Sequence, residues 1–144
     1  DNEDLEIVFT EESTQCDDPS DCCYYDYDLT RTWTVTDCAG NQFIHVQEIE
    51  VQDTTKPVAL CRNFTVELDK NGKWVITPDD VNNGSYDNCA APEYLTYTID
   101  IDTFTCANLG DNVVTLTVTD PCGNFSTCTA VVTVVEGIAP CVPE

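Results

Sequence analysis

An oxygen-rich stretch at residues 80–87, DVNNGSYD, offers side chains of the kind that bind a hard cation. Its candidate ligands are Asp80, Asn82, Ser85 and Asp87. Carboxylate, amide and hydroxyl oxygens suit calcium, although their spacing here is not that of an EF-hand loop. The stretch therefore predicts a cation site that the fold would have to complete from elsewhere.

Two further carboxylates, Asp53 and Asp120, are expected at the same end of the fold as this stretch. Carboxylates that converge repel one another unless a cation sits between them, and the chain has a formal charge of −22 to relieve. We therefore expect calcium as a cofactor. The alternative is that Asp80 and Asp87 only accept hydrogen bonds from nearby amides in Asx turns.

The segment CDDPSDCCYYDYD, residues 16–28, is a second candidate site. Tyr24, Tyr25 and Tyr27, together with Asp26, could contact a glycan or a protein, because aromatic rings with a polar tip are common in binding surfaces. The acidic side chains of this loop are weaker metal candidates, and a solvated loop is the favoured interpretation of them. Three Asn-x-Ser/Thr sequons, at Asn63, Asn83 and Asn124, are candidate glycosylation sites.

Charge excludes several function classes. Only 5 residues are Lys or Arg against 27 Asp and Glu, so the chain cannot neutralise a phosphate backbone and nucleic-acid binding is not expected. Anionic membrane surfaces should repel it, and no apolar run reaches the roughly 20 residues needed to span a bilayer. The single histidine, His45, lies in an alternating run and has no nucleophile in a known hydrolase motif. We therefore expect no enzyme.

Ten cysteines are scattered along the chain without a paired CxxC arrangement, which argues against a zinc ribbon. Many cysteines in a strand-rich chain indicate disulfides and an oxidising compartment, so an extracellular protein is expected. The ten candidate disulfide residues are Cys16, Cys22, Cys23, Cys38, Cys61, Cys89, Cys106, Cys122, Cys128 and Cys141.

Strands must position these residues, since alternating runs rich in Val, Thr, Ile and aromatic residues dominate the chain. Expected strands cover 29–36, 43–51, 64–68, 73–77, 94–101, 113–119 and 127–135. A hairpin turn is expected at 69–72, only DDVNN could begin a short helical turn, and Trp33 and Trp74 are expected in the core. The pattern is that of an all-β sandwich.

The chain also repeats itself. VTDCAGN at 35–41 returns as VTDPCGN at 118–124, an offset of 83 that also relates Pro57 to Pro140. A constant offset of this length indicates two homologous units. Because Asp1-Asn2 resembles Asp87-Asn88, deep inside the second unit, the first unit lacks counterparts of the first two strands.

We therefore expect an incomplete repeat at 1–55, a complete one at 56–138, and the start of another repeat or an inter-subunit linker at 139–144. A sandwich without two strands exposes edges and core. Either upstream chain was cut away or another chain fills the gap. A mature or excised segment is expected, since the sequence begins with Asp1 and shows no signal peptide.

Several phrases carry a family resemblance: DTTKPVALC, FTVELDKNGKWVITPDDVNNGSYDNC, GDNVVTLTVTDPCGNFSTCTAVVTVV and LTRTWTVTDCAGN. They resemble the hyalin-repeat (HYR-like) and immunoglobulin-like tandem repeats of giant bacterial surface adhesins, in particular SprB-type gliding-motility adhesins of Bacteroidota. The resemblance implies a disulfide-rich array of immunoglobulin-like sandwiches, display on the cell surface and type IX secretion. This sequence departs from the family pattern at Glu3, where the family usually has Cys after Asp-Asn, and in its acidic loop at 16–28.

In such a sandwich the first and last strands begin at the same end, which predicts a Cys61–Cys128 disulfide. The resemblance supports that pair and implies Cys89–Cys106. Cys16 is expected to bond Cys22 or Cys23, because bonding between those two neighbours is strained. The residue left over is compatible with an interdomain bond to Cys122. Cys38 and Cys141 would then meet only between copies or neighbouring repeats, and Thr54 fits a Bacteroidota O-glycosylation pattern by resemblance.

Two functions follow as hypotheses. The first is a structural repeat of an extracellular adhesin or filament, stiffened by calcium and disulfides, whose partners are neighbouring repeats or copies of itself. The second is a glycan- or protein-binding module that uses loop 16–28.

Overall fold

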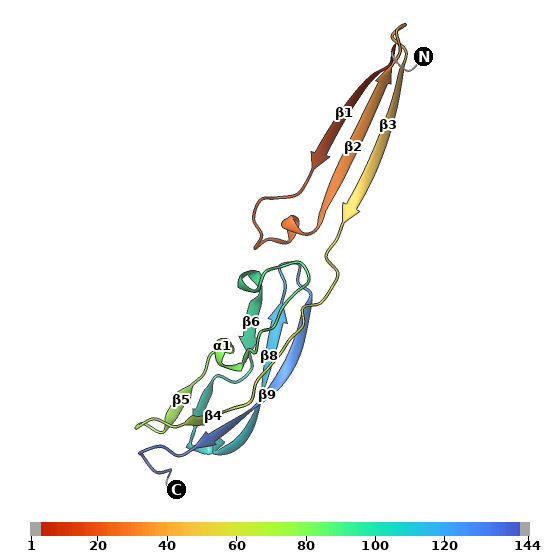
Figure 1. Cartoon of the computed structure of the whole chain (residues 1–144). Helices are drawn as coiled ribbons and strands as arrows, with labels where there is room; N and C mark the ends of the chain where they lie inside the picture. Colours follow the sequence, from red (N-terminus) through yellow and green to blue (C-terminus); the bar gives the residue numbers. More distant parts are fainter. Residues whose placement is uncertain (1–3, 142–144) are drawn as a thin grey trace. The chain divides into compact units, whose positions relative to one another are not determined.

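The computed structural model describes residues 4–141, so the predictions for Asp1-Asn2 and for 142–144 lie outside the described residues. The chain is all-β and disulfide-rich, and it divides into two compact units, Asp1–Thr54 and Thr55–Glu144 (Figure 1). None of the helices in residues 4–141 has the length and hydropathy that a membrane-spanning helix requires.

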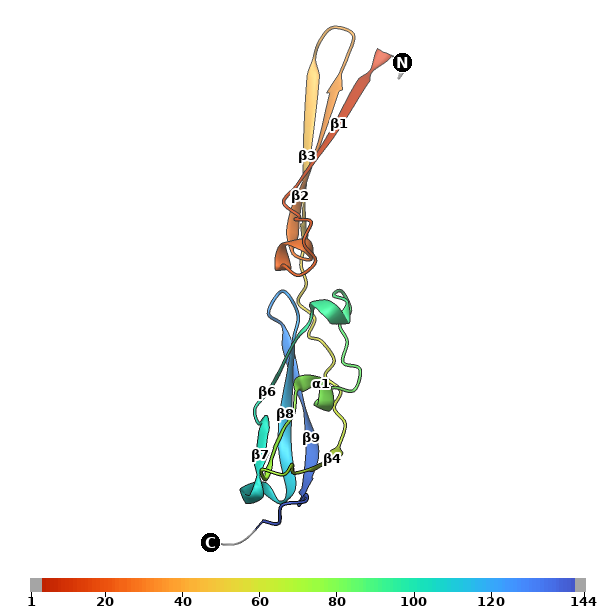
Figure 2. The ribbon, with the colours of Figure 1, turned by 90° about the vertical axis from the view of Figure 1, so that its left-hand side faces the viewer.

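The first unit is a three-stranded antiparallel sheet of β1 (Glu6–Ser13), β2 (Tyr27–Thr36) and β3 (Gln42–Val51), with β2 in the centre. A single 3-10 turn, η2 (Cys22–Tyr24), lies in the β1–β2 loop. β1 was not among the expected strand runs, and it extends through Ser13 because Glu11, Glu12 and Ser13 all pair with β2. The three strands form one layer, as the two views in Figures 1 and 2 show.

The second unit is an immunoglobulin-like sandwich. One sheet has the order β4-β9-β8-β6, from β4 (Phe64–Glu67), β9 (Phe125–Val135), β8 (Gly110–Thr119) and β6 (Thr96–Ile99). The other pairs β5 (Lys73–Val75) with β7 (Thr103–Thr105). Short helical turns connect them: α1 (Pro78–Val81), η3 (Pro92–Tyr94) and η4 (Cys106–Asn108). β4 runs parallel to β9 and the other pairs are antiparallel, which gives the strand order of immunoglobulin-like domains.

The core of the second unit lies between its two sheets. β8 and β9 alternate, so that one face is aliphatic and buried while the other is rich in threonine. The buried hydrophobic residues are Val66, Leu68, Ile76, Val81, Ala90, Leu95, Phe104, Val114, Leu116, Val118, Ala130, Val132 and Val134. All of these residues belong to the second unit. Residues of β4, α1 and β7, such as Val66, Val81 and Phe104, are buried together with the inner face of β8 and β9.

The sequence repeat is also a structural repeat. Trp33 pairs with His45 across β2 and β3, and the residues 83 positions later, Leu116 and Cys128, pair across β8 and β9. The third strand matches too, because Phe9 faces Trp33 as Ile99 faces Leu116. The first unit is thus the β6-β8-β9 part of the second, and its described residues contain no counterpart of β4, β5 or β7.

The expectation that both tryptophans lie in the core is wrong for Trp74. Trp74 is 44% exposed rather than in the core, because β5 belongs to a two-stranded sheet that covers only part of the indole. Trp33 is half-buried and touches Phe9 and His45, with ring centroids 5.2 Å and 5.7 Å away.

Candidate functional site

The repeated phrase folds into the same turn in both units. In the second unit, Asp120 Oδ1 accepts hydrogen bonds from the amides of Cys122 and Asn124 at 2.9 and 3.0 Å, and Oδ2 accepts one from Asn124 Nδ2 at 2.8 Å. Asp37 accepts the equivalent bonds from Ala39 and Asn41. The phrase is therefore repeated because it builds the turn that joins two long strands.

Glycine completes this turn. Gly40 and Gly123 have φ of 85° and 87°, a region that side chains with a Cβ rarely adopt. The Asn41 side chain and amides hold the pKa of Asp37 below its ordinary value, because their hydrogen bonds favour the charged carboxylate. The carboxylate of Asp120, one of the predicted cation ligands, therefore accepts hydrogen bonds within the turn itself.

The other predicted ligands of the second unit also make local bonds. Asp80 Oδ2 accepts from the amide and hydroxyl of Thr77 in a capping box at the start of α1. Asn82 Oδ1 accepts from the Ser85 amide at 3.0 Å. The buried Ser85 hydroxyl accepts from the Leu60 amide at 2.9 Å and donates to the Leu60 carbonyl. These bonds fasten the strand-like segment before β4 to the 82–86 loop.

Asp87 differs from these residues. Its Oδ2 accepts from the amides of Cys89 and Ala90 at 3.0 and 2.9 Å, while its Oδ1 is buried and has no hydrogen-bond partner. A buried carboxylate oxygen without a partner is costly, and a cation would satisfy it. Within the described part of the second unit, no three acidic, thiol or imidazole ligand atoms lie within 4.8 Å of one another. Asp53 belongs to the other unit, and its part in the site stays a prediction.

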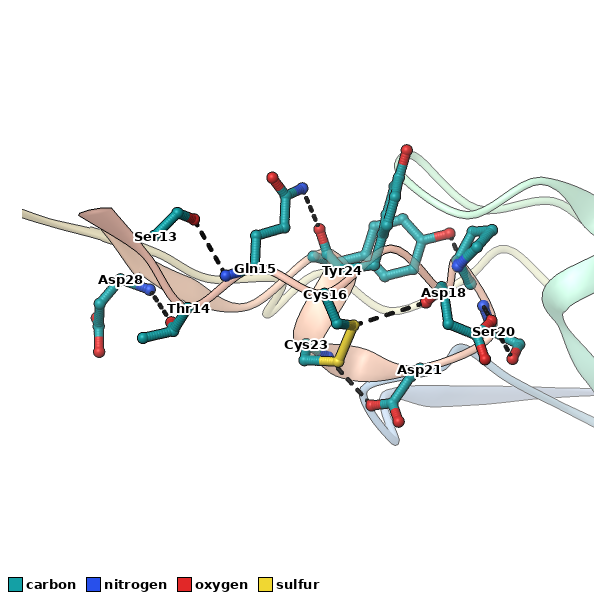
Figure 3. Close-up of a disulfide and its surroundings, with 12 residues drawn as sticks. Ser13, Thr14, Gln15, Cys16, Asp18, Ser20, Asp21, Cys23, Tyr24 and Asp28 are labelled. Carbon is teal, nitrogen blue, oxygen red and sulfur yellow. Dashed lines mark hydrogen bonds between the residues drawn. A yellow bond between two sulfur atoms is a disulfide. The ribbon is translucent and has the colours of Figure 1, made fainter. Parts of the chain in front are cut away.

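The acidic, tyrosine-rich loop between β1 and β2 is well ordered by its own bonds (Figure 3). A Cys16–Cys23 disulfide closes it, with the Cα atoms 5.4 Å apart. Asp21 caps η2 through the Cys23 amide, and Asp18 accepts from the amide and hydroxyl of Ser20. The Ser20 bonds lower the pKa of Asp18, because they favour its charged form.

The tyrosines of this loop differ in exposure. Tyr25 donates from its hydroxyl to the Pro19 carbonyl at 2.8 Å and is half-buried, so it holds the loop together. Tyr24 stacks edge-on against it at 5.0 Å and remains exposed. Tyr27 begins β2 half-buried, and Asp26 is exposed. Tyr24 and Asp26 are the residues of the predicted set that a ligand would reach most readily.

The disulfides confirm some pairings and correct others. Cys16 bonds Cys23, and Cys61 bonds Cys128, as expected. The Cys89–Cys106 pairing is wrong, because Cys106 bonds Cys141. The Cys89 sulfur instead accepts a hydrogen bond from the Asn88 side chain.

The same bond overturns the predicted Cys38–Cys141 bridge between copies, since Cys141 is used within the second unit. Cys38 is exposed in the β2–β3 turn and forms no disulfide. Cys22 and Cys122 are also in the disulfide form, and an interdomain bond stays a prediction.

The candidate glycosylation residues differ in availability. Thr54, Asn63 and Asn83 are exposed. Asn124 is half-buried, and its Nδ2, the atom that a glycan would occupy, donates to Asp120. Modification of Asn124 would therefore disrupt the β8–β9 turn.

Comparisons with known proteins add a structural likeness. No family model matches the chain, and no curated protein matches it in sequence. The crystal structure of human mucin-like protocadherin EC1-2 is similar with 13% sequence identity and a TM-score of 0.42, and the match covers 94% of this chain and 86% of that one. This similarity says nothing about a ligand or activity of the chain.

Proposed function

We propose that the chain is a structural repeat unit of an extracellular cell-surface adhesin or filament. The observation that carries the proposal is the duplication of one β6-β8-β9 framework in consecutive units, down to the same Asp-capped turn. A module that is repeated for its framework serves length and stiffness, because each copy adds the same rigid sheet. No enzymatic activity is proposed.

Disulfides support the extracellular location. Cys61–Cys128 and Cys106–Cys141 tie both ends of β9 to other parts of the second unit. Such bonds persist in oxidising compartments. The sequence resemblance further supports an HYR-like repeat of a gliding-motility adhesin, exported by type IX secretion.

Surface labelling tests this proposal. Antibodies against residues 4–141 should label intact cells of the organism that makes the chain, along extended structures that protrude from the surface. Label confined to permeabilised cells would refute it. Pulling the chain in a force microscope gives an independent test: because Cys61–Cys128 closes off 67 residues, reduction should lengthen the unfolding of the second unit by ~220 Å.

Calcium stiffening is part of this proposal, and the unpartnered Asp87 Oδ1 supports it. Bound calcium stabilises the folded state by mass action, by about 2.7 kcal/mol at a hundredfold excess over Kd. The melting temperature should therefore rise with calcium and fall with EDTA. Asp87→Asn should remove this response, and Asp79→Asn, on the exposed side of α1, should keep it. Identical melting in calcium and EDTA would refute calcium binding.

A second candidate function is recognition of a glycan or protein by loop 16–28. The exposed Tyr24 on a disulfide-closed loop favours it. A glycan array separates the two functions, because a purely structural repeat should bind nothing. Tyr24→Ser is a sharper control than deletion of the loop, since it keeps the Cys16–Cys23 bond and the Tyr25 anchor.

A further inference from the structure

The two faces of the first sheet differ in charge and in aromatic content. Cross-strand partners share a face, so Phe9, Trp33 and His45 lie on one side. That side, here called the Trp33 face, consists of Ile7, Phe9, Glu11, Ser13, Tyr27, Leu29, Arg31, Trp33, Val35, Phe43, His45, Gln47, Ile49 and Val51. The opposite face carries the acidic residues Glu6, Glu12, Asp28, Glu48 and Glu50.

The Trp33 face is close to neutral on a chain of charge −22. Glu11 and Arg31 are the only Asp, Glu, Lys or Arg residues on this face, and they form a salt bridge at 2.7 Å. The face is also open, with Phe9 50% and Phe43 68% exposed. A contiguous apolar surface of this kind on an otherwise acidic sheet marks an interaction site.

The second unit shows what covers the equivalent face. At the matching positions of β8 and β9, Leu116, Val118 and Val132 are fully buried. Residues 56–76 supply part of the cover, with Val66, Leu68 and Ile76. The other buried hydrophobic residues outside β8 and β9 are Val81, Ala90, Leu95 and Phe104. β4 in this segment also pairs in parallel with the outer edge of β9 at Val132–Val135, and the corresponding edge of β3 is unpaired in the described first unit.

The distribution of basic residues also favours a cover of the type of residues 56–76. Residues 56–76 carry four of the five basic residues of the chain, Lys56, Arg62, Lys70 and Lys73. Residues 1–54 are strongly acidic as a whole, and Arg31 is their only Lys or Arg. A basic covering segment therefore complements the first unit in charge as well as in hydrophobicity.

We propose that the Trp33 face binds a basic, strand-forming polypeptide segment of the type of residues 56–76, supplied by another repeat. The segment adds a strand parallel to β3 at Ile49–Val51 and lays its aliphatic side chains over Trp33. His45 stands where Cys128 bonds Cys61 in the second unit, so the contact is non-covalent. The inference rests on the comparison of the two units and not on the proposed adhesin role.

A second copy of the chain is a poorer occupant. Its own residues 56–76 are held in place by Cys61–Cys128, and two chains of charge −22 repel one another. Self-association through two Trp33 faces is therefore the outcome that would contradict the proposal.

The test uses a synthetic peptide of residues 56–76 with Cys61→Ser, added to the full chain. In a Trp74→Phe background the fluorescence of Trp33 reports binding, with the peptide carrying Trp74→Phe as well. Phe43→Ser should weaken binding by tenfold or more, since it removes a large apolar contact. Ile44→Ser is the matched control, because Ile44 is the next residue of β3, is 57% exposed and lies on the acidic face, and it should change binding less than twofold.

Far-UV circular dichroism establishes that both variants fold. Saturable binding that Phe43→Ser loses and Ile44→Ser keeps supports the proposal. No binding up to about 1 mM peptide, which excludes a Kd of that order or tighter, or equal losses in both variants would overturn it. Dimers of the full chain in sedimentation that Phe43→Ser dissociates would also overturn it, in favour of a second copy. None of these outcomes bears on surface display.

Discussion

The Asp-capped turn between β8 and β9 allows a quantitative prediction. Asp120→Ala removes a carboxylate that is 4% exposed and accepts three hydrogen bonds, at 2.8, 2.9 and 3.0 Å. Two of the donors are part-buried main-chain amides, of Cys122 and Asn124. The variant therefore withdraws the acceptor from donors that water reaches poorly.

The magnitude follows from these contacts. A hydrogen bond to a charged group contributes about 1.5–3 kcal/mol. The three bonds share one carboxylate and are not additive, so we expect Asp120→Ala to lower the free energy of unfolding by about 3 kcal/mol. Asp120→Asn keeps an oxygen for the two main-chain amides and should lose only about 1 kcal/mol.

The repeat supplies the control. Asp37 makes the same three bonds in the β2–β3 turn, but that turn is exposed and water can replace the lost acceptor. Asp37→Ala should therefore cost its own unit less than Asp120→Ala costs the second.

Each unit contains one tryptophan, so urea unfolding can be followed separately. Trp33→Phe leaves Trp74 as the reporter of the second unit, and Trp74→Phe leaves Trp33 as the reporter of the first. A loss below about 1 kcal/mol for Asp120→Ala, less than one such hydrogen bond is worth, would refute the reasoning. So would an equal or larger loss for Asp37→Ala.

Three further predictions concern other contacts. Replacing Cys61 and Cys128 together by alanine should cost the second unit about 4 kcal/mol, because the bond closes a 67-residue separation; a urea midpoint within error of the parent would contradict this. Because the pKa of Asp37 lies below its ordinary value of 3.8, its stabilisation is complete above that pH and is lost as pH falls through the lowered pKa. The side-chain amide resonance of Asn41 should therefore shift only below pH 3.8, and a midpoint above that value would argue against the bond. Gly137→Ala should destabilise the second unit by about 1–3 kcal/mol, since a Cβ there would lie 1.7 Å from the Leu68 carbonyl oxygen, and thermal melting at the parent temperature would disprove this close approach.

Local pattern predicted much of the fold. Alternation of apolar and polar residues marks β2, β3, β8 and β9 as strands. In β8 and β9 one face is buried and the other meets water, whereas no residue of β2 or β3 is buried. The Asp-x-x-Gly-Asn phrase identifies its turn for the same local reason, since every bond of the turn lies within five residues. β1 was missed because its sequence EIVFTEES is polar at both ends and pairs only through β2.

Pairings between distant residues were harder to predict. Cys106 lies in η4, just before Gly110, and Gly110 pairs with Val134 at the end of β9. The chain then reaches Cys141 within a few residues, which brings the two sulfurs together. This proximity depends on the β8–β9 register and not on any local signal. Similarly, the sequence did not reveal that the carboxylate oxygens of Asp80 and Asp120 accept hydrogen bonds from nearby backbone amides.

The comparison of the two units shows that the same alternation can have unequal consequences. In the second unit the aliphatic face is covered by its own chain, and two disulfides hold the cover and the end of β9 in place. In the first unit the equivalent face has larger aromatic residues, Phe9 and Trp33 in place of Ile99 and Leu116. Its Cys16–Cys23 disulfide closes only a short loop. The covering segment that we propose for the Trp33 face would bury these aromatic rings, and would thereby add to the first unit apolar burial of the kind that the second unit obtains from its own chain.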